Sequence, residues 1–312
     1  MLTKQFRPFF IVSKLPFFVR TMSSSSTIPP RDSVKRHAHS DFEIVQEARP
    51  KFDADHHLFY TKSPNAENWK PGQGANSDDW KKHKKIDFDP YAEGRSPINN
   101  YKLMVSGITP RPIAFISTIS KDGVTNLAPF SYFEVVNSDP IIFTVGISKG
   151  TGFEKDTASN LKATGEATIN IISEWFIEAA NFTCTNAPRN VSEWPLSGLT
   201  KAKSVKVAPA LVAESAFSVE VKVRQVVEFT SHRTGNASGE LFILEGVHVH
   251  VREDVVDEEL ANVDLAKLKP VARCGGITYT PAIQAFEIPR PAYEVEVEPK
   301  PEVKALLENE EK

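Results

Sequence analysis

Apolar residues in the middle of the chain recur in the short runs and alternating patterns that are typical of β-strands. Residues 113–119 and 141–147 form two apolar runs, each just after a proline, and predict strands buried on both faces. Residues 217–224 alternate between apolar and polar, which predicts a half-buried antiparallel strand, and a second long strand is expected over residues 241–251. The pair Asp122-Gly123 favours a tight hairpin after the first strand, because glycine readily adopts a positive φ.

Two helical segments are expected between these strands. Asp156 or Thr157 is predicted to cap the first, which ends before Gly165, a favourable residue just past a helix end. The second spans roughly residues 174–183. The short helices do not alternate steadily with the strands, so the pattern predicts a mainly β fold, a small closed or partly split β-barrel with short helices, over residues 95–290.

The segments outside this core differ in composition. Residues 23–94 are polar and aperiodic and predict an irregular N-terminal arm, whereas residues 291–312 are rich in glutamate and predict an acidic mobile tail. Residues 1–22 contain basic but no acidic residues, which is typical of a mitochondrial transit peptide; the alternative is a cytoplasmic protein that starts at Met22. The apolar runs of this segment are too short to cross a bilayer, so no membrane partner is expected.

Composition excludes several classes of protein. The 312 residues carry a net charge of −3 with 25% charged and 40% hydrophobic residues, which is ordinary for a soluble globular chain and excludes a strongly basic nucleic-acid binder. Two cysteines cannot build a disulfide framework or a four-cysteine metal site. The glycine fingerprint of dinucleotide-binding folds, the phosphate loop and the Gly-x-Ser-x-Gly elbow of hydrolases are all absent from the sequence.

No metal site is expected from the histidines. His56-His57 and the pair His37/His39 lack a neighbouring cysteine or carboxylate cluster, so solvated surface histidines are expected there. His248 and His250 share one face of a predicted strand, where an exposed or interface pair is favoured over a metal site.

A series of short motifs follows one order along the core. The motifs are PRPIAFIST at 110–118, Asp122-Gly123, NLAPFSYF at 126–133, Asp139-Pro140, and KDT at 155–157 with Asn160. This series resembles the flavin reductase-like family, and the similarity covers about residues 96–288. The resemblance implies an FMN-binding split β-barrel that works as a homodimer with flavin near the subunit interface. Val221 and Cys274 depart from the family pattern and affect the expected local packing more than the cofactor.

The same motifs offer the groups that FMN requires: polar groups for the ring edge, apolar groups for the ring face and cations or amides for the phosphate. Lys155 and Thr157 stand at a helix start, where unpaired amides favour an anion. Asp156 would repel the phosphate and is assigned to capping. The simpler alternatives are a plain capped surface helix and, for the loop, an ordinary turn and strand. The predicted cofactor-binding residues are Ser117, Thr118, Asn126, Leu127, Ala128, Phe130, Ser131, Tyr132, Lys155, Thr157, Arg273 and Tyr279.

Arg273 is a candidate for stabilising negative charge on the reduced ring, with an ordinary interface ion pair as the alternative. Arg111, between two prolines, is expected to be structural, and the two cysteines are expected to be buried or incidental thiols.

The predicted function is an FMN-dependent oxidoreductase that transfers a hydride from NADH or NADPH to bound flavin. No residue is predicted to be indispensable for that transfer. Two alternatives stay open. One is a flavin-binding electron carrier or a partner subunit, for example of an oxygenase, without NAD(P)H activity of its own. The other is a dimeric interaction module without flavin.

Overall fold

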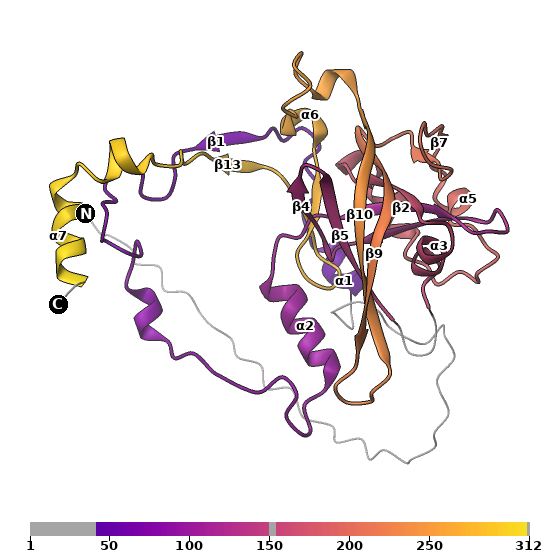
Figure 1. Cartoon of the computed structure of the whole chain (residues 1–312), viewed down its shortest axis with the longest axis horizontal. Helices are drawn as coiled ribbons and strands as arrows, with labels where there is room; N and C mark the ends of the chain where they lie inside the picture. The colour runs from indigo at the N-terminus through magenta and orange to yellow at the C-terminus, as the bar shows by residue number, and fades with distance from the viewer. Residues whose placement is uncertain (1–41, 150–153, 311–312) are drawn as a thin grey trace, which may run out of the picture.

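A seven-stranded antiparallel sheet forms the centre of the protein. The structure is a computed structural model that describes residues 42–149 and 154–310. The strands lie in the order β3-β2-β6-β9-β10-β5-β4 (Figure 1). Their bounds are β2 (Ala114–Ile119), β3 (Thr125–Phe130), β4 (Phe133–Ser138), β5 (Ile141–Ser148), β6 (Glu166–Ile171), β9 (Phe217–Thr230) and β10 (Ala237–Val251). The four strands expected from the sequence are confirmed.

The sheet curves back on itself to make the split barrel. Strands β3 and β4 stand at opposite ends of the strand order, yet only Ser131 and Tyr132 join them. The amide of Gly146 in β5 donates to the carbonyl of Tyr132 at 2.7 Å, which ties this connection to the far end of the sheet. The mainly β, split-barrel prediction is therefore confirmed.

Two apolar clusters lie on the two faces of the curved sheet. Ile116, Val145 and Phe242 belong to the cluster inside the barrel, which also includes Leu161 from helix α3 (Asp156–Thr164). Phe115 belongs to a second cluster with residues of α4 (Ile177–Phe182) and α5 (Trp194–Ser197). Adjacent residues of a strand point to opposite faces, so Phe115 and Ile116 serve different clusters.

The two predicted helical segments are present where they were expected, but the cap of the first and the helix type of the second differ from the prediction. Helix α3 ends at Thr164, and Gly165, the next residue, has a φ of 73° and takes the left-handed position expected just past the helix. The cap prediction is wrong, because Lys155 is the N-cap and neither Asp156 nor any other side chain in residues 42–149 and 154–310 caps the helix. The second predicted helix is a 3₁₀ turn, η3 (Glu174–Phe176), followed directly by α4. The remaining helices are α1 (Phe42–Glu47), η2 (Asp79–Lys82), α2 (Pro97–Gly107), η4 (Glu253–Val255), α6 (Leu265–Leu268), η5 (Tyr293–Val297) and α7 (Pro301–Glu310).

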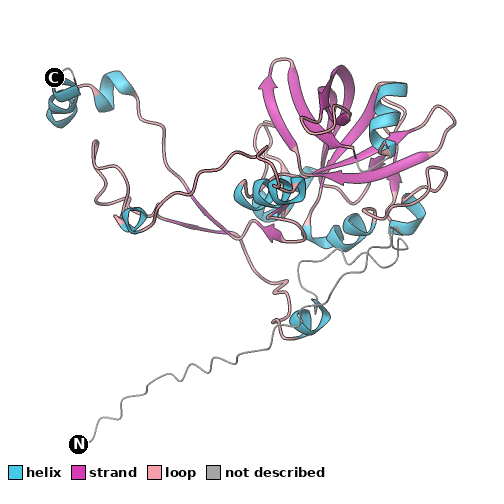
Figure 2. Ribbon diagram, turned by 90° about the horizontal axis from the view of Figure 1, so that it is seen from below, coloured by secondary structure: helices cyan, strands magenta, loops and turns pink. Residues whose placement is uncertain are grey.

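The N-terminal and C-terminal segments run side by side away from the barrel (Figures 1 and 2). Strand β1 (Phe59–Thr61) pairs in parallel with β13 (Gln284–Phe286), and further out Leu306 of α7 lies against Gly72, where an added Cβ would be 2.7 Å from its side chain. The remaining short strands are β7 (Lys201–Ala202), β8 (Leu211–Val212), β11 (Val271–Arg273) and β12 (Tyr279–Pro281). The predicted transit peptide and the pair His37/His39 lie outside the described residues. No described helix has the length and apolar character needed to span a membrane.

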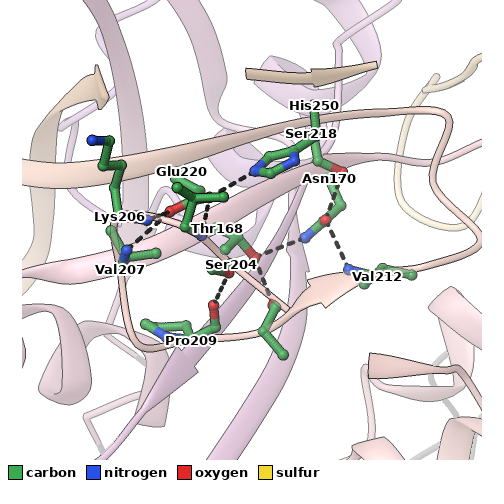
Figure 3. A network of polar contacts seen from close by, with 12 residues as sticks. Thr168, Asn170, Ser204, Lys206, Val207, Pro209, Val212, Ser218, Glu220 and His250 are labelled. Carbon is green, nitrogen blue, oxygen red and sulfur yellow. Dashed lines mark hydrogen bonds and ion pairs between the residues drawn. The ribbon is translucent and has the colours of Figure 1, made fainter. Parts of the chain in front are cut away.

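The polar face of β9 is covered at its start, where the sequence pattern had predicted exposure, whereas Lys222 and Arg224 further along it are exposed as expected. Ser218 and Glu220 are only 2% and 0% exposed. The segment 204–212 packs over them, held by polar bonds such as those from the Val212 amide to Asn170 Oδ1 (3.0 Å) and from Ser218 Oγ to the same oxygen (2.8 Å) (Figure 3). The alternation correctly placed these side chains on the face opposite the barrel core but could not show that the segment just before β9 folds over them.

The sequence suggested that His56 is solvated, but the structure shows its side chain to be largely covered. Its Nε2 lies 2.9 Å from Glu174 Oε1, and both side chains are 10% exposed. The hydrogen bond to the carbonyl of Asp53 and the nearby Glu174 charge raise the pKa of His56 against the opposing effect of burial. His57 is exposed, as expected.

Candidate functional site

The start of α3 meets the hairpin formed by β2 and β3, so two of the predicted motifs lie together. Asn126 Nδ2 donates to Thr157 Oγ1 at 2.8 Å and to Thr118 Oγ1 at 3.3 Å. Asn160 Nδ2 donates to the same Thr118 oxygen at 3.0 Å. All four side chains are buried. This network fixes the helix start against the strand pair.

The N-terminus of α3 has the properties of an anion site. Lys155 is exposed at the N-cap position, and no side chain of the described residues caps the first amides of this nine-residue helix. Unpaired amides and the positive end of the helix dipole favour a phosphate, and a lysine adds a full charge.

Arg189 adds a second cation that the sequence pattern did not indicate. Its guanidinium lies 3.7 Å from Asp156 Oδ1 and donates to Ser159 Oγ. Burial raises the pKa of the Asp156 carboxyl, and the charges of Arg189 and Lys155 oppose that rise. Asp156 is therefore balanced by neighbouring cations and does not cap the helix. Arg189 lies in a loop far from the helix in sequence, so no spacing rule could have found it.

A cleft of about 470 Å³ opens beside this helix. Asn126, Asp156, Ser159, Asn160 and Arg189 are among its lining residues, together with the turn at residues 120–122. Both asparagines use their amide nitrogens in the buried network, so the cleft and the network share side chains.

The remaining loop residues extend along β3 away from the helix. Ser131 is five residues beyond Asn126, which corresponds to roughly 17 Å in an extended strand. Phe130 packs against the cluster inside the barrel, Ser131 is partly buried and Tyr132 is 40% exposed. The predicted ring contacts are thus placed at the end of β3 opposite the helix start, and Phe130 also serves the core.

Leu127 has a structural partner that the sequence did not predict. Its buried side chain belongs to the second cluster, and its amide donates to Glu193 Oε2 at 3.1 Å. Burial raises the pKa of the Glu193 carboxyl, while the Leu127 amide partly offsets that rise. The Leu127 amide is therefore not free for a cofactor, whereas the neighbouring Ala128 is only partly buried.

Ser117 and Thr118 cannot act on the same side of β2. Ser117 is 1% exposed and shares the strand face of Phe115, whereas Thr118 joins the network at α3. The structure thus brings Thr118, but not Ser117, to the helix start.

Arg273 and Tyr279 lie together on the paired strands β11 and β12. The guanidinium carbon of Arg273 lies 4.3 Å from the centre of the Tyr279 ring, and Tyr279 Oη donates to Asn181 Oδ1 at 2.8 Å. Desolvation raises the pKa of the Cys184 thiol, and the positive charges of Arg273 and Lys155 both oppose this rise. Among the described residues, Arg273 has no carboxylate within ion-pair distance.

Arg111 has the structural role that was predicted for it. Its Nη1 donates to the carbonyls of Val105 and Ile108, the latter at 2.7 Å, and its Nη2 lies 3.5 Å from the carbonyl of Gly275. These bonds link α2 to the barrel and to the loop after β11.

A second cleft, of about 360 Å³, has a different chemistry. Its lining is almost wholly apolar and includes Pro112, Phe133, Phe143 and Val249, with Glu134 as its one charged residue. A carboxylate repels a phosphate, so this cleft does not suit that part of FMN. The start of α3, with its neighbouring cations and its amides, does suit the phosphate.

Comparison with known proteins agrees with this geometry. Residues 105–267 match the model of the flavin reductase like domain. An uncharacterised protein of Halalkalibacterium halodurans is 34% identical over 193 residues, which are 62% of this chain and 91% of the relative. The chain belongs to the flavin reductase-like family. Family membership identifies it as a flavin-related oxidoreductase and supports FMN as the flavin.

Solved structures show the same fold for this family. The nitrilotriacetate monooxygenase component B of Bacillus cereus is 30% identical, covers 66% of this chain and 100% of its own, and has a TM-score of 0.62. A Shewanella frigidimarina protein described as a flavin reductase with a split barrel domain is 23% identical, covers 64% of this chain and 94% of its own, and has a TM-score of 0.53. The family match includes Lys155, Thr157 and the β2–β3 hairpin, whereas Arg273, Tyr279 and both terminal segments lie outside it.

Proposed function

We propose that the protein is an FMN-dependent oxidoreductase that accepts a hydride from NADH or NADPH. The observation that carries this proposal is the uncapped α3 N-terminus with Lys155, held against the β2–β3 hairpin by the bond between Asn126 and Thr157. This donor set fits a phosphate, and family membership supplies the flavin to which that phosphate belongs.

The residues of the chain bind and orient the cofactor. Lys155 and the first amides of α3 bind the phosphate by charge-assisted hydrogen bonds. The buried network of Thr118, Asn126 and Asn160 keeps that helix start in place. Bound FMN supplies the hydride chemistry, and the protein contributes alignment and electrostatics.

Arg273 is the candidate for stabilising negative charge that develops on the flavin ring. Its cation is positioned over Tyr279, whose hydroxyl is in turn held by Asn181. No carboxylate among the described residues neutralises it, so its charge is available to a ligand. No acid–base group is required of the protein in this scheme.

We also propose that two copies of the chain associate. Val135 and Val136 of β4 are 55% and 54% exposed, and this edge strand borders the apolar cleft. Exposed apolar residues on an edge strand favour association with another chain. The B. cereus relative is named as one component of a monooxygenase, which supports a partner oxygenase or another electron acceptor for this chain as well.

Anaerobic mixing with reduced nicotinamide tests the proposed activity. The FMN-loaded protein is mixed separately with NADH and NADPH, and the flavin absorption band is followed. We expect one of the two to bleach the band within seconds. If dithionite bleaches the band while neither nicotinamide does so, the protein is a carrier or partner subunit and the proposed activity is wrong.

A further inference from the structure

Two histidines and a carboxylate meet on the outer face of the β9–β10 pair. His248 and His250 are two residues apart on β10, so both side chains point to the same face. Glu220 of β9 is the register partner of His248. Directly opposite residues on antiparallel strands have neighbouring Cβ atoms, so the strand pairing itself assembles the three side chains.

The Glu220 carboxylate is rigidly held. Its Oε1 accepts from the Val205 amide at 2.7 Å, and its Oε2 accepts from the amides of Lys206 and Val207, the latter at 2.9 Å (Figure 3). These bonds use three of the roughly four lone-pair positions of a carboxylate. The remaining position on Oε1 points to His250 Nε2, which lies 2.6 Å away.

The spacing of these groups suits a cation. One ligand atom from each of Glu220, His248 and His250 lies within 4.8 Å of the other two. Tetrahedral zinc with bonds of about 2.0–2.1 Å holds its ligand atoms roughly 3.3 Å apart, so small side-chain rotations suffice. The His248 and His250 rings are already adjacent, with centroids 4.9 Å apart.

We propose that Glu220, His248 and His250 form a binding site for a divalent cation of the zinc class, with a fourth position open to water. Imidazole and carboxylate ligands suit such a cation, and a set of two histidines and one glutamate is a known zinc donor set. The amides that orient Glu220 do what outer-shell partners do in metal sites, because they fix a ligand before the metal arrives.

The bound cation connects the segment at residues 205–207, through Glu220, to strand β10. It is separate from the cleft beside α3, because none of the three ligand residues lines that cleft. The proposal therefore does not depend on the proposed redox function.

Zinc titration of the untagged full-length protein tests the site. The chain is freed of metal and titrated with Zn²⁺ in competition with a chromophoric chelator. We expect one Zn²⁺ per chain that binds at least tenfold more weakly to His248→Ala and to His250→Ala. The His248 side chain makes no hydrogen bond within the described residues, so its replacement leaves the network of Glu220 in place. Zn²⁺ should also raise the Tm of the wild-type protein more than that of either variant at the same concentration.

His57→Ala is the matched control, because His57 is an exposed histidine outside the barrel. It should bind Zn²⁺ as the wild type does. Three results would overturn the proposal: no Zn²⁺ bound by the wild type, undiminished binding by His248→Ala, or an equal loss in His57→Ala.

Discussion

Replacing Glu220 by alanine should lower the free energy of unfolding by about 3 kcal/mol. The carboxylate is fully buried, and it accepts hydrogen bonds from the amides of Val205, Lys206 and Val207 and from His250. Its removal leaves these donors without an acceptor on the covered face of β9. For a barrel of this size, the loss corresponds to a decrease in Tm of roughly 6–12 °C, measurable by thermal unfolding.

Glu228→Ala on the same strand is the matched control. Glu228 is exposed, and surface substitutions away from special features change stability by about 0.5 kcal/mol or less. Equal destabilisation by the two variants would contradict the role assigned to Glu220.

The effect of this substitution should depend on pH in a defined direction. Burial alone would raise the pKa of the Glu220 carboxyl, but the three amides and His250 together hold it below its ordinary value of 4.5. A carboxyl with a lowered pKa stabilises the fold above the unfolded-state pKa, and this stabilisation is lost as the pH falls through the folded-state pKa. The stability difference between wild type and Glu220→Ala should be constant near neutral pH and shrink below about pH 4.5.

Replacing Lys155 by alanine should weaken FMN binding about tenfold, which corresponds to roughly 1.4 kcal/mol. Lys155 is exposed at the uncapped start of α3, where its ammonium group can reach a bound phosphate. The dissociation constant is measured from the change in flavin fluorescence. Because salt screens an exposed charge, the difference between wild type and variant should decrease at high ionic strength.

Riboflavin separates the phosphate contact from a general effect on the site. It lacks the phosphate, so Lys155→Ala should leave riboflavin binding unchanged. Lys84→Ala, which removes an exposed lysine in the N-terminal segment, should change neither affinity. An unchanged FMN dissociation constant in Lys155→Ala would show that the phosphate lies elsewhere.

The sequence predicted the elements whose pattern is local. Residues 113–119 and 141–147 are strands because they are apolar runs, and α3 ends where Gly165 allows a positive φ. The burial of Glu220 could not be predicted, because the covering residues 204–212 come earlier in the chain and show no periodicity. The parallel pairing of β1 with β13 could not be predicted either, since three-residue strands more than two hundred residues apart leave no recognisable pattern in the sequence.

The candidate site was also predictable only where its residues belong to local sequence motifs. The motifs identified Asn126, Thr157 and Lys155, and the structure shows Asn126 and Thr157 in direct contact. Arg189 and Glu193 were not assigned to the site, because long-range contacts set their roles. The capping assignment of Asp156 failed because the side chain faces Arg189 rather than the amides of its own helix.

Titration of the purified, flavin-free protein with FMN tests the central claim most directly. We predict saturable binding of one FMN per chain, seen as a change in the flavin absorption band, with tighter binding of FMN than of riboflavin because the α3 N-terminus holds the phosphate. A protein that leaves the FMN spectrum unchanged, or that binds riboflavin as tightly as FMN, would contradict the assignment of the phosphate to the start of α3.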